Sequence, residues 1–222
     1  MNEVKNYEAN VDKMYTYLKA FFRGAGMTDA MRALQYAREK HKNQTRKNGV
    51  PYIVHPLSMA CYAAALNITD GNIMATILLH DVCEDCGVTV EQLPFNDTIK
   101  NGVKYMTVIK FETDRDKRET KSRYYKNLLE SKIAIVCKAL DRYNNLTDMP
   151  FALSADAIGK NAAETELFLL PVLKEAKEKW VDLSDVLFVL RTNIRGINNI
   201  LKLHYSEEYE KWMNIYQQKV DK

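Results

Sequence analysis

Glycine and proline are scarce in this sequence. Its 222 residues include eight glycines and five prolines, roughly half their combined share in an average protein. All-β folds contain many tight turns, and these turns consume both residue types, so the shortage argues against a sandwich or a barrel. Apolar residues instead recur at helical spacing through most of the chain. We predict an all-α fold, a helical bundle of about 8–11 helices in a single domain.

Long apolar runs are also missing. None approaches the ~18 residues that a membrane span needs, and the polar start Met1–Lys5 does not resemble a signal peptide. The 32 basic and 29 acidic residues leave a formal net charge of +3, without the clustered basic stripe that nucleic-acid binding requires. The four cysteines do not resemble a disulfide framework. We therefore predict a cytoplasmic protein with no membrane or nucleic-acid partner.

The chain contains no linker that would separate two domains. Its predicted segments are an N-terminal helix in residues 1–26 that packs on the core, a main domain in residues 27–205, and a polar C-terminal tail in residues 206–222. Several signals mark helix boundaries. They are Thr28 as an N-cap, Asp70 as the residue that a helix follows, a capping-box pattern in Thr89–Gln92, and Pro171 as the site of a kink in a helical stretch over residues 154–179.

A group of acidic residues and a histidine follows the most apolar of the predicted helices. His80 and Asp81 stand at its end, and Glu84 and Asp85 lie four residues further on, at the i, i+4 spacing that places side chains on one helical face. A second histidine, His55, stands directly before Pro56 at a junction of loop and helix. A solvated helix end is the ordinary interpretation of such a group.

Asp141 favours a metal site over that interpretation. It lies on the apolar stripe of its own predicted helix, where an unpaired carboxylate would be costly to bury. Neither Lys138 nor Arg142 shares that stripe, so a metal ion is the simplest partner. Two imidazoles and two carboxylates suit Mn²⁺, Fe²⁺ and Zn²⁺ equally well. Because such clusters also occur without a metal, both interpretations stay open on spacing alone.

Together these residues follow the order H…HD…D, which resembles the HD-domain metal-dependent phosphohydrolases. Three longer motifs are similar to those of the RelA/SpoT-type guanosine tetraphosphate hydrolases. They are His41–Pro56 (HKNQTRKNGVPYIVHP), Leu79–Asp85 (LHDVCED) and Ala139–Leu146 (ALDRYNNL). The resemblance extends from about residue 27 to about residue 176 and implies that residues 27–205 form an HD hydrolase domain.

The resemblance implies a stand-alone enzyme, without a synthetase domain, that removes the 3′-pyrophosphate of guanosine tetra- or pentaphosphate to give GDP or GTP. It favours Mn²⁺ as the cofactor. The implied roles are metal ligands for His55, His80, Asp81 and Asp141, acid/base catalysis for Glu84 and Asp85, and substrate binding for Arg46, Lys47 and Asn145. A planar guanidinium such as that of Arg46 can stack on a purine and attract phosphate.

The sequence departs from the family pattern at Cys86, Asn144 and Thr147, where Thr, His and Arg are usual. The last two departures leave the substrate open. Two alternatives therefore remain: an HD phosphohydrolase for another nucleotide, such as an adenosine alarmone or a nucleoside monophosphate, and a catalytically silent alarmone-binding module. The oligomeric state stays open, with a homodimer as one option.

Overall fold

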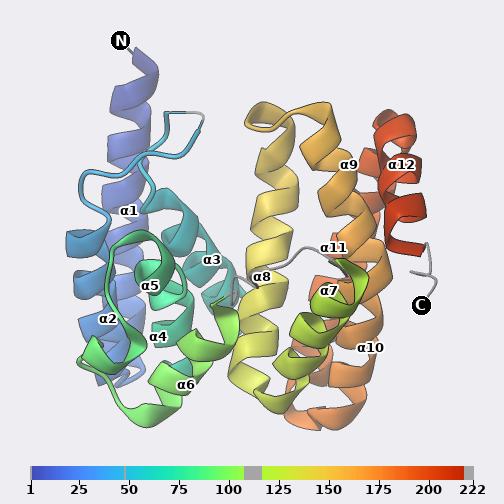
Figure 1. Cartoon of the computed structure of the whole chain (residues 1–222). Coiled ribbons are helices and arrows are strands. Elements are labelled where there is room, and N and C mark those ends of the chain that lie inside the picture. The colour runs from blue at the N-terminus through green and yellow to red at the C-terminus, as the bar shows by residue number, and fades with distance from the viewer. Residues whose placement is uncertain (1, 48, 108–116, 218–222) are drawn as a thin grey trace. The chain divides into compact units, whose positions relative to one another are not determined.

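The computed structural model describes residues 2–47, 49–107 and 117–217, and every regular element within these ranges is a helix (Figure 1). The prediction of an all-α fold is confirmed. Contacts between residues divide the chain into two compact units, residues 1–107 and 108–222, called here the N-terminal and C-terminal units. None of the described helices is long and apolar enough to cross a membrane.

The N-terminal unit is built around α4, whose residues from Ile73 to Leu79 are all buried. Helices α2, α3 and α6 pack on α4, and α1 packs on α2 and α3. The helices of this unit are α1 (Asn2–Gly24), α2 (Thr28–Lys40), α3 (Val54–Ala65), α4 (Gly71–Leu79), α5 (Val82–Asp85), the 3₁₀ helix η1 (Val90–Gln92) and α6 (Asp97–Met106). A helix that is apolar on every face needs neighbours all round, which explains why α4 lies at the centre.

The C-terminal unit packs α11 against α8 and α10, and α12 against α9. Its helices are α7 (Lys117–Asn127), η3 (Leu128–Glu130), α8 (Lys132–Asp148), η4 (Met149–Phe151), α9 (Ala155–Glu164), η5 (Thr165–Leu169), α10 (Leu170–Lys179), η6 (Val181–Leu183), α11 (Ser184–His204) and α12 (Ser206–Gln217). Of these short elements, η5 is a π-helical turn and the other three are 3₁₀ helices.

Helix boundaries follow the sequence signals in part. Asp70 caps α4 by accepting hydrogen bonds from the backbone N–H groups of Asn72 and Ile73, and Thr89 and Gln92 form the predicted capping box. Thr28, in contrast, is the first residue of α2, and the N-cap is Met27, which makes no side-chain capping bond. A threonine at a helix start resembles a cap in sequence even when the chain enters the helix one residue earlier.

The polar tail predicted for residues 206–222 is wrong for residues 206–217, which form α12; residues 218–222 lie outside the described part of the chain. Tyr209 and Tyr216 are buried and Trp212 is half-buried, so the aromatic residues of α12 share one face at i, i+3, i+7 spacing. This face packs on α9 (Figure 1). Overall polarity concealed a narrow apolar stripe, which is enough to dock a surface helix.

The approach of α12 to α9 depends on Gly159. A Cβ atom built at Gly159 would lie 2.5 Å from Cβ of Glu208 and 2.6 Å from its backbone carbonyl carbon. Gly159→Ala should therefore lower the free energy of unfolding by about 1–3 kcal/mol, because overpacking outweighs the better helix propensity of alanine. Urea denaturation followed by circular dichroism measures this change.

Gly196→Ala is the matched control, since Gly196 lies within α11 and a Cβ atom there meets nothing within 4 Å. That variant should gain about 0.5–1 kcal/mol. Equal gains in both variants would contradict the close approach of α9 and α12.

Candidate metal centre

His80 lies in the N-terminal unit, at the C-cap of α4, and is 3% exposed. Helix α4 ends at Leu79 and α5 begins only at Val82, so His80 and Asp81 stand between the two helices. The imidazole Nδ1 lies 2.8 Å from the carbonyl oxygen of Ile77. Because a carbonyl oxygen can only accept, Nδ1 carries the hydrogen and Nε2 is left as the atom available to a ligand.

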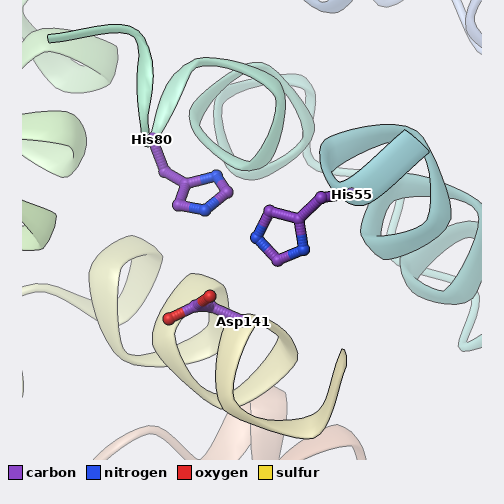
Figure 2. Close-up of side chains that lie close together, drawn as sticks. All are labelled: His55, His80 and Asp141. Carbon is purple, nitrogen blue, oxygen red and sulfur yellow. The ribbon is translucent and has the colours of Figure 1, made fainter. Parts of the chain in front are cut away.

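His55 faces His80 from the first turn of α3 and is also buried. Figure 2 shows the two imidazole rings turned toward one another, with centroids 5.2 Å apart and planes at 62°. Their ligand nitrogen atoms lie within 4.8 Å of one another. Pro56 suits the first turn of a helix, so the sequence fixes both where α3 begins and where its histidine stands.

The Asp81 carboxylate lies beside both rings. Its Oδ2 atom is 3.0 Å from Nε2 of His80 and 3.7 Å from Nε2 of His55. With Nδ1 of His80 donating to Ile77, the Nε2 lone pair and the carboxylate oxygen are both acceptors, and two facing acceptors need a proton or a metal ion to bind them. Two imidazoles and a carboxylate are the donor groups that divalent transition metals take in proteins, so these residues fit such an ion.

Tyr52 orients Asp81, a role that sequence reasoning missed. Its hydroxyl donates a hydrogen bond of 2.5 Å to the same Oδ2 atom. Burial, followed by the charges of Asp81 and Asp85, raises the pKa of Tyr52 above its ordinary value, so the hydroxyl remains a donor. Tyr52 stands three residues before His55 within the first motif. This position is the only feature of the sequence that points to its role.

His41 and Gln44 hold Tyr52 in place, and sequence reasoning missed them too, because only their position in the first motif points to them. The buried His41 ring stacks on Tyr52 with centroids 4.7 Å apart, and its Nδ1 lies 2.6 Å from Oε1 of Gln44. Burial lowers the pKa of His41. The amide of Gln44 in turn donates to the backbone carbonyl of Asp85, 2.9 Å away, so these contacts join the first motif to the second.

Glu84 and Asp85 are exposed on α5. The backbone N–H of Asp85 donates to the carbonyl oxygen of Asp81 over 2.9 Å, so Asp81 and Asp85 are one helical turn apart, as their spacing predicted. The neighbouring Cys83 and Cys86 form no disulfide bond, and neither do Cys61 and Cys137. Burial raises the pKa of Cys61 and of Cys83 to about 11, which suits side chains that serve in packing.

The predicted substrate residues Arg46 and Lys47 lie on a tight turn before α3. The backbone of Arg46 bonds to Val50 and to Gly49, each over 2.8 Å, and Gly49 has a φ of +81° that favours glycine. Asn48 lies outside the described residues. Arg46 is half-buried and Lys47 is exposed, so Lys47 is accessible to an anionic ligand.

Asp141, the third side chain labelled in Figure 2, belongs to the C-terminal unit and projects from α8. It is 7% exposed, as its position on the apolar stripe predicted. Asn145, one turn later, donates a hydrogen bond of 2.6 Å to Oδ1. The prediction that Lys138 does not share this face is wrong: its Nζ atom lies 2.8 Å from Oδ2, because residues at i, i+3 are neighbours on a helix.

The Lys138–Asp141 pair changes the argument for a metal. Burial alone would lower the pKa of Lys138, but Asp141 and the neighbouring Tyr124 and Tyr125 together hold it well above its ordinary value. Burial raises the pKa of Tyr124 to about 12. Asp141 thus has a cationic partner within α8, and its burial does not by itself require a metal ion.

Residues 33–156 match the family described as HD domain. This match covers more than half of the chain, which therefore belongs to the HD-domain family. It includes His55, His80, Asp81 and Asp141, and it draws on both units. The resemblance to HD-domain proteins inferred from the motifs is confirmed.

Two of the curated relatives are bacterial proteins. The chain is 31% identical over 197 residues to the guanosine-3′,5′-bis(diphosphate) 3′-pyrophosphohydrolase of Aquifex aeolicus, covering 84% of this chain and 25% of that protein. It is 34% identical over 139 residues to the bifunctional (p)ppGpp synthase/hydrolase SpoT of Escherichia coli K12, covering 58% of this chain and 19% of that protein. The chain thus matches 25% of the length of one of these relatives and 19% of the other.

A solved structure is similar over nearly its whole length. It is described as a metazoan orthologue of SpoT that hydrolyses ppGpp and plays a role in starvation responses. The sequence identity is 25% and the TM-score 0.50, and the match covers 82% of this chain and 94% of that one.

Breaking the Lys138–Asp141 pair should destabilise the protein in the presence of a chelator. Lys138→Met leaves a buried carboxylate without its cation, and removing one partner of a buried pair costs about 3 kcal/mol. Denaturation in EDTA measures the change in the free energy of unfolding.

Lys132→Met on the same helix is the matched control. Lys132 pairs with Asp182 at 3.1 Å, but both side chains are well exposed, so its loss should cost less than about 0.5 kcal/mol. If the two variants are equally stable, Lys138 does not neutralise Asp141.

Proposed function

We propose that this chain is a metal-dependent hydrolase that removes the 3′-pyrophosphate of guanosine tetra- or pentaphosphate. One observation carries the proposal: in a chain of the HD-domain family, two buried imidazoles and a carboxylate meet, and Nε2 of His80 lies 3.0 Å from Oδ2 of Asp81 while Nδ1 donates to a carbonyl oxygen. The guanosine substrate is supported by what the relatives and the solved structure are named for.

His55, His80, Asp81 and Asp141 are the proposed ligands, and Mn²⁺ is the proposed ion. Support for the first three is the geometry of their side chains, and support for Asp141 is its place in the H…HD…D order. When bound, a divalent ion supplies Lewis-acid polarisation of the phosphoryl oxygens. The hydrogen bonds from His80 to Ile77 and from Tyr52 to Asp81 orient the ligands, as the outer partners of metal-binding residues generally do.

Glu84 and Asp85 are the proposed acid/base pair. A water molecule attacks the phosphorus atom attached to the ribose 3′-oxygen. The bond between this phosphorus atom and the 3′-oxygen breaks, and pyrophosphate leaves. One carboxylate takes the proton of the attacking water, and the 3′-oxygen receives a proton to become a hydroxyl. Both side chains are exposed on α5, where they can reach a bound substrate and exchange protons with solvent.

Arg46, Lys47 and Asn145 are the proposed contacts with substrate. A guanidinium can stack on the guanine ring, and the lysine ammonium is a point charge for phosphate. Asn145 has one amide hydrogen bonded to Asp141, and its carbonyl oxygen can accept from a ribose hydroxyl. Four cysteines without a disulfide bond suit the reducing cytoplasm that we propose for the chain.

Incubation with a panel of nucleotides tests the function. Purified protein with Mn²⁺ should convert guanosine tetraphosphate to GDP and pyrophosphate, which chromatography separates. The panel should include the adenosine analogue and nucleoside monophosphates. Faster turnover of one of these would replace the proposed substrate, and binding without turnover of any would indicate a regulatory module.

The wild-type chain should bind one Mn²⁺ ion, and His80→Ala should lose it, because a divalent site depends on its imidazole ligands. Elemental analysis after loading and desalting measures the metal content. His204→Ala is the control, since His204 is exposed at the end of α11. A wild-type chain that holds no ion after loading would rule out the proposed metal chemistry.

Glu84→Gln and Asp85→Asn should keep the metal ion but lose turnover by about 10²–10⁴-fold, the usual contribution of a general acid or base. Steady-state rates at saturating substrate measure the loss. Glu91→Gln, at another exposed acidic residue of the N-terminal unit, should turn over like the wild type. Full activity in both the Glu84 and the Asp85 variant would disprove the acid/base assignment.

A further inference from the structure

Glu164 is a buried acid that the proposed reaction does not use. It lies at the end of α9 in the C-terminal unit and is 4% exposed. Its Oε2 atom is 3.1 Å from Nζ of Lys121, and its Oε1 atom accepts a hydrogen bond of 2.7 Å from the hydroxyl of Tyr216. Burial alone would raise the pKa of Glu164, but the charges of Lys121 and Arg142 hold it below its ordinary value, so the carboxylate is ionised.

Arg142 is the second charged residue of this buried group and directly follows Asp141 on α8. Its guanidinium donates to Oδ1 of Asn161 over 2.6 Å and to the hydroxyl of Tyr125 over 2.7 Å. One of its nitrogen atoms lies 3.9 Å from Oε2 of Glu164. The guanidinium is therefore fixed by partners on α7 and α9, and it cannot move without breaking bonds of charged groups, which are among the stronger hydrogen bonds in proteins.

Tyr216 connects α12 to this group. Its side chain is 1% exposed, and its ring packs edge-on against Phe168, with centroids 5.4 Å apart and planes at 85°. The hydroxyl reaches past this aromatic contact to Glu164. Packing of the ring thus needs no hydroxyl, whereas the hydroxyl holds one of the two carboxylate oxygens of Glu164.

We propose that Tyr216 is a positioning residue for Asp141: through Glu164 it fixes the guanidinium of Arg142, and so the turn of α8 from which Asp141 projects. The proposal rests on the function proposed above, in which Asp141 is a metal ligand. A ligand must be held within about half an ångström of its working position. Asp141 directly precedes Arg142, whose guanidinium is held by three side chains.

Tyr216→Phe removes the hydroxyl and keeps the ring. The side-chain carboxyl ¹³C resonance of Asp141, assigned by its loss in Asp141→Asn, should shift in Tyr216→Phe. The Mn²⁺ dissociation constant should rise about three- to tenfold, within the range of energetic coupling through packed networks. Saturating Mn²⁺ should restore kcat without a change in KM for the nucleotide, because Asp141 contacts the ion.

Tyr209→Phe is the matched control on the same helix. Tyr209 is also buried, and its ring lies 5.0 Å from Nζ of Lys202. It should lose stability comparably, with the Asp141 resonance and the Mn²⁺ affinity of the wild type. A purely structural role for Tyr216 would make the two variants alike, and this outcome would overturn the proposal.

A double-mutant cycle tests the route through Glu164. If Tyr216 acts through Glu164, Glu164→Gln alone should weaken Mn²⁺ binding, and adding Tyr216→Phe should weaken it little further. Additive effects would overturn this route. A displaced Asp141 resonance in Tyr216→Phe, together with a wild-type chain that binds no Mn²⁺, would refute the proposed function and leave the positioning role intact.

Discussion

The hydrogen bond from Nδ1 of His80 to the carbonyl oxygen of Ile77 is the interaction on which the candidate metal centre depends. A buried imidazole needs a partner for each nitrogen, and this bond assigns one nitrogen to the protein and leaves the other for a ligand. It forms because α4 ends at Leu79, where carbonyl groups of the last turn lack helical partners. The interruption of the helix at His80 and Asp81 is therefore part of the site. The residues of α4 that precede His80 are apolar because they form the core that holds it in place.

Much of this arrangement could be predicted from the sequence, and the reason is local. Asp70 and the capping box of Thr89 make hydrogen bonds within three residues of the chain, so a short stretch of sequence is enough to predict these helix starts. The H…HD…D order indicated His55, His80 and Asp81 as candidate ligands, and the structure brings their side chains together. The part played by Tyr52, His41 and Gln44 could not be predicted. The hydrogen bond from Tyr52 to Asp81 joins residues 29 positions apart, and neither stretch of sequence indicates that it contacts the other.

Two wrong predictions came from underestimating which residues share one face of a helix. Lys138 was placed off the face of Asp141, but a flexible lysine one turn away reaches round the helix. The segment after residue 205 was taken as a tail because its composition is polar, although its aromatic residues recur along one face. In both places side-chain reach and spacing, rather than average polarity, decided the structure. Asp141 on α8 and Glu164 on α9 are buried acids of the C-terminal unit, and each has a lysine partner.

The π-helical turn η5 has a consequence for the register of the C-terminal unit. In an α-helix each residue advances by about 100°, so one additional residue would rotate everything after it to another face. A π turn absorbs such a residue in place. Thr165–Leu169 thus lets Glu164 keep its buried position on α9 while Leu173 and Ala176 of α10 still point inward. The turn therefore sets the register of α10 separately from that of α9, and the buried face of each helix stays on the core.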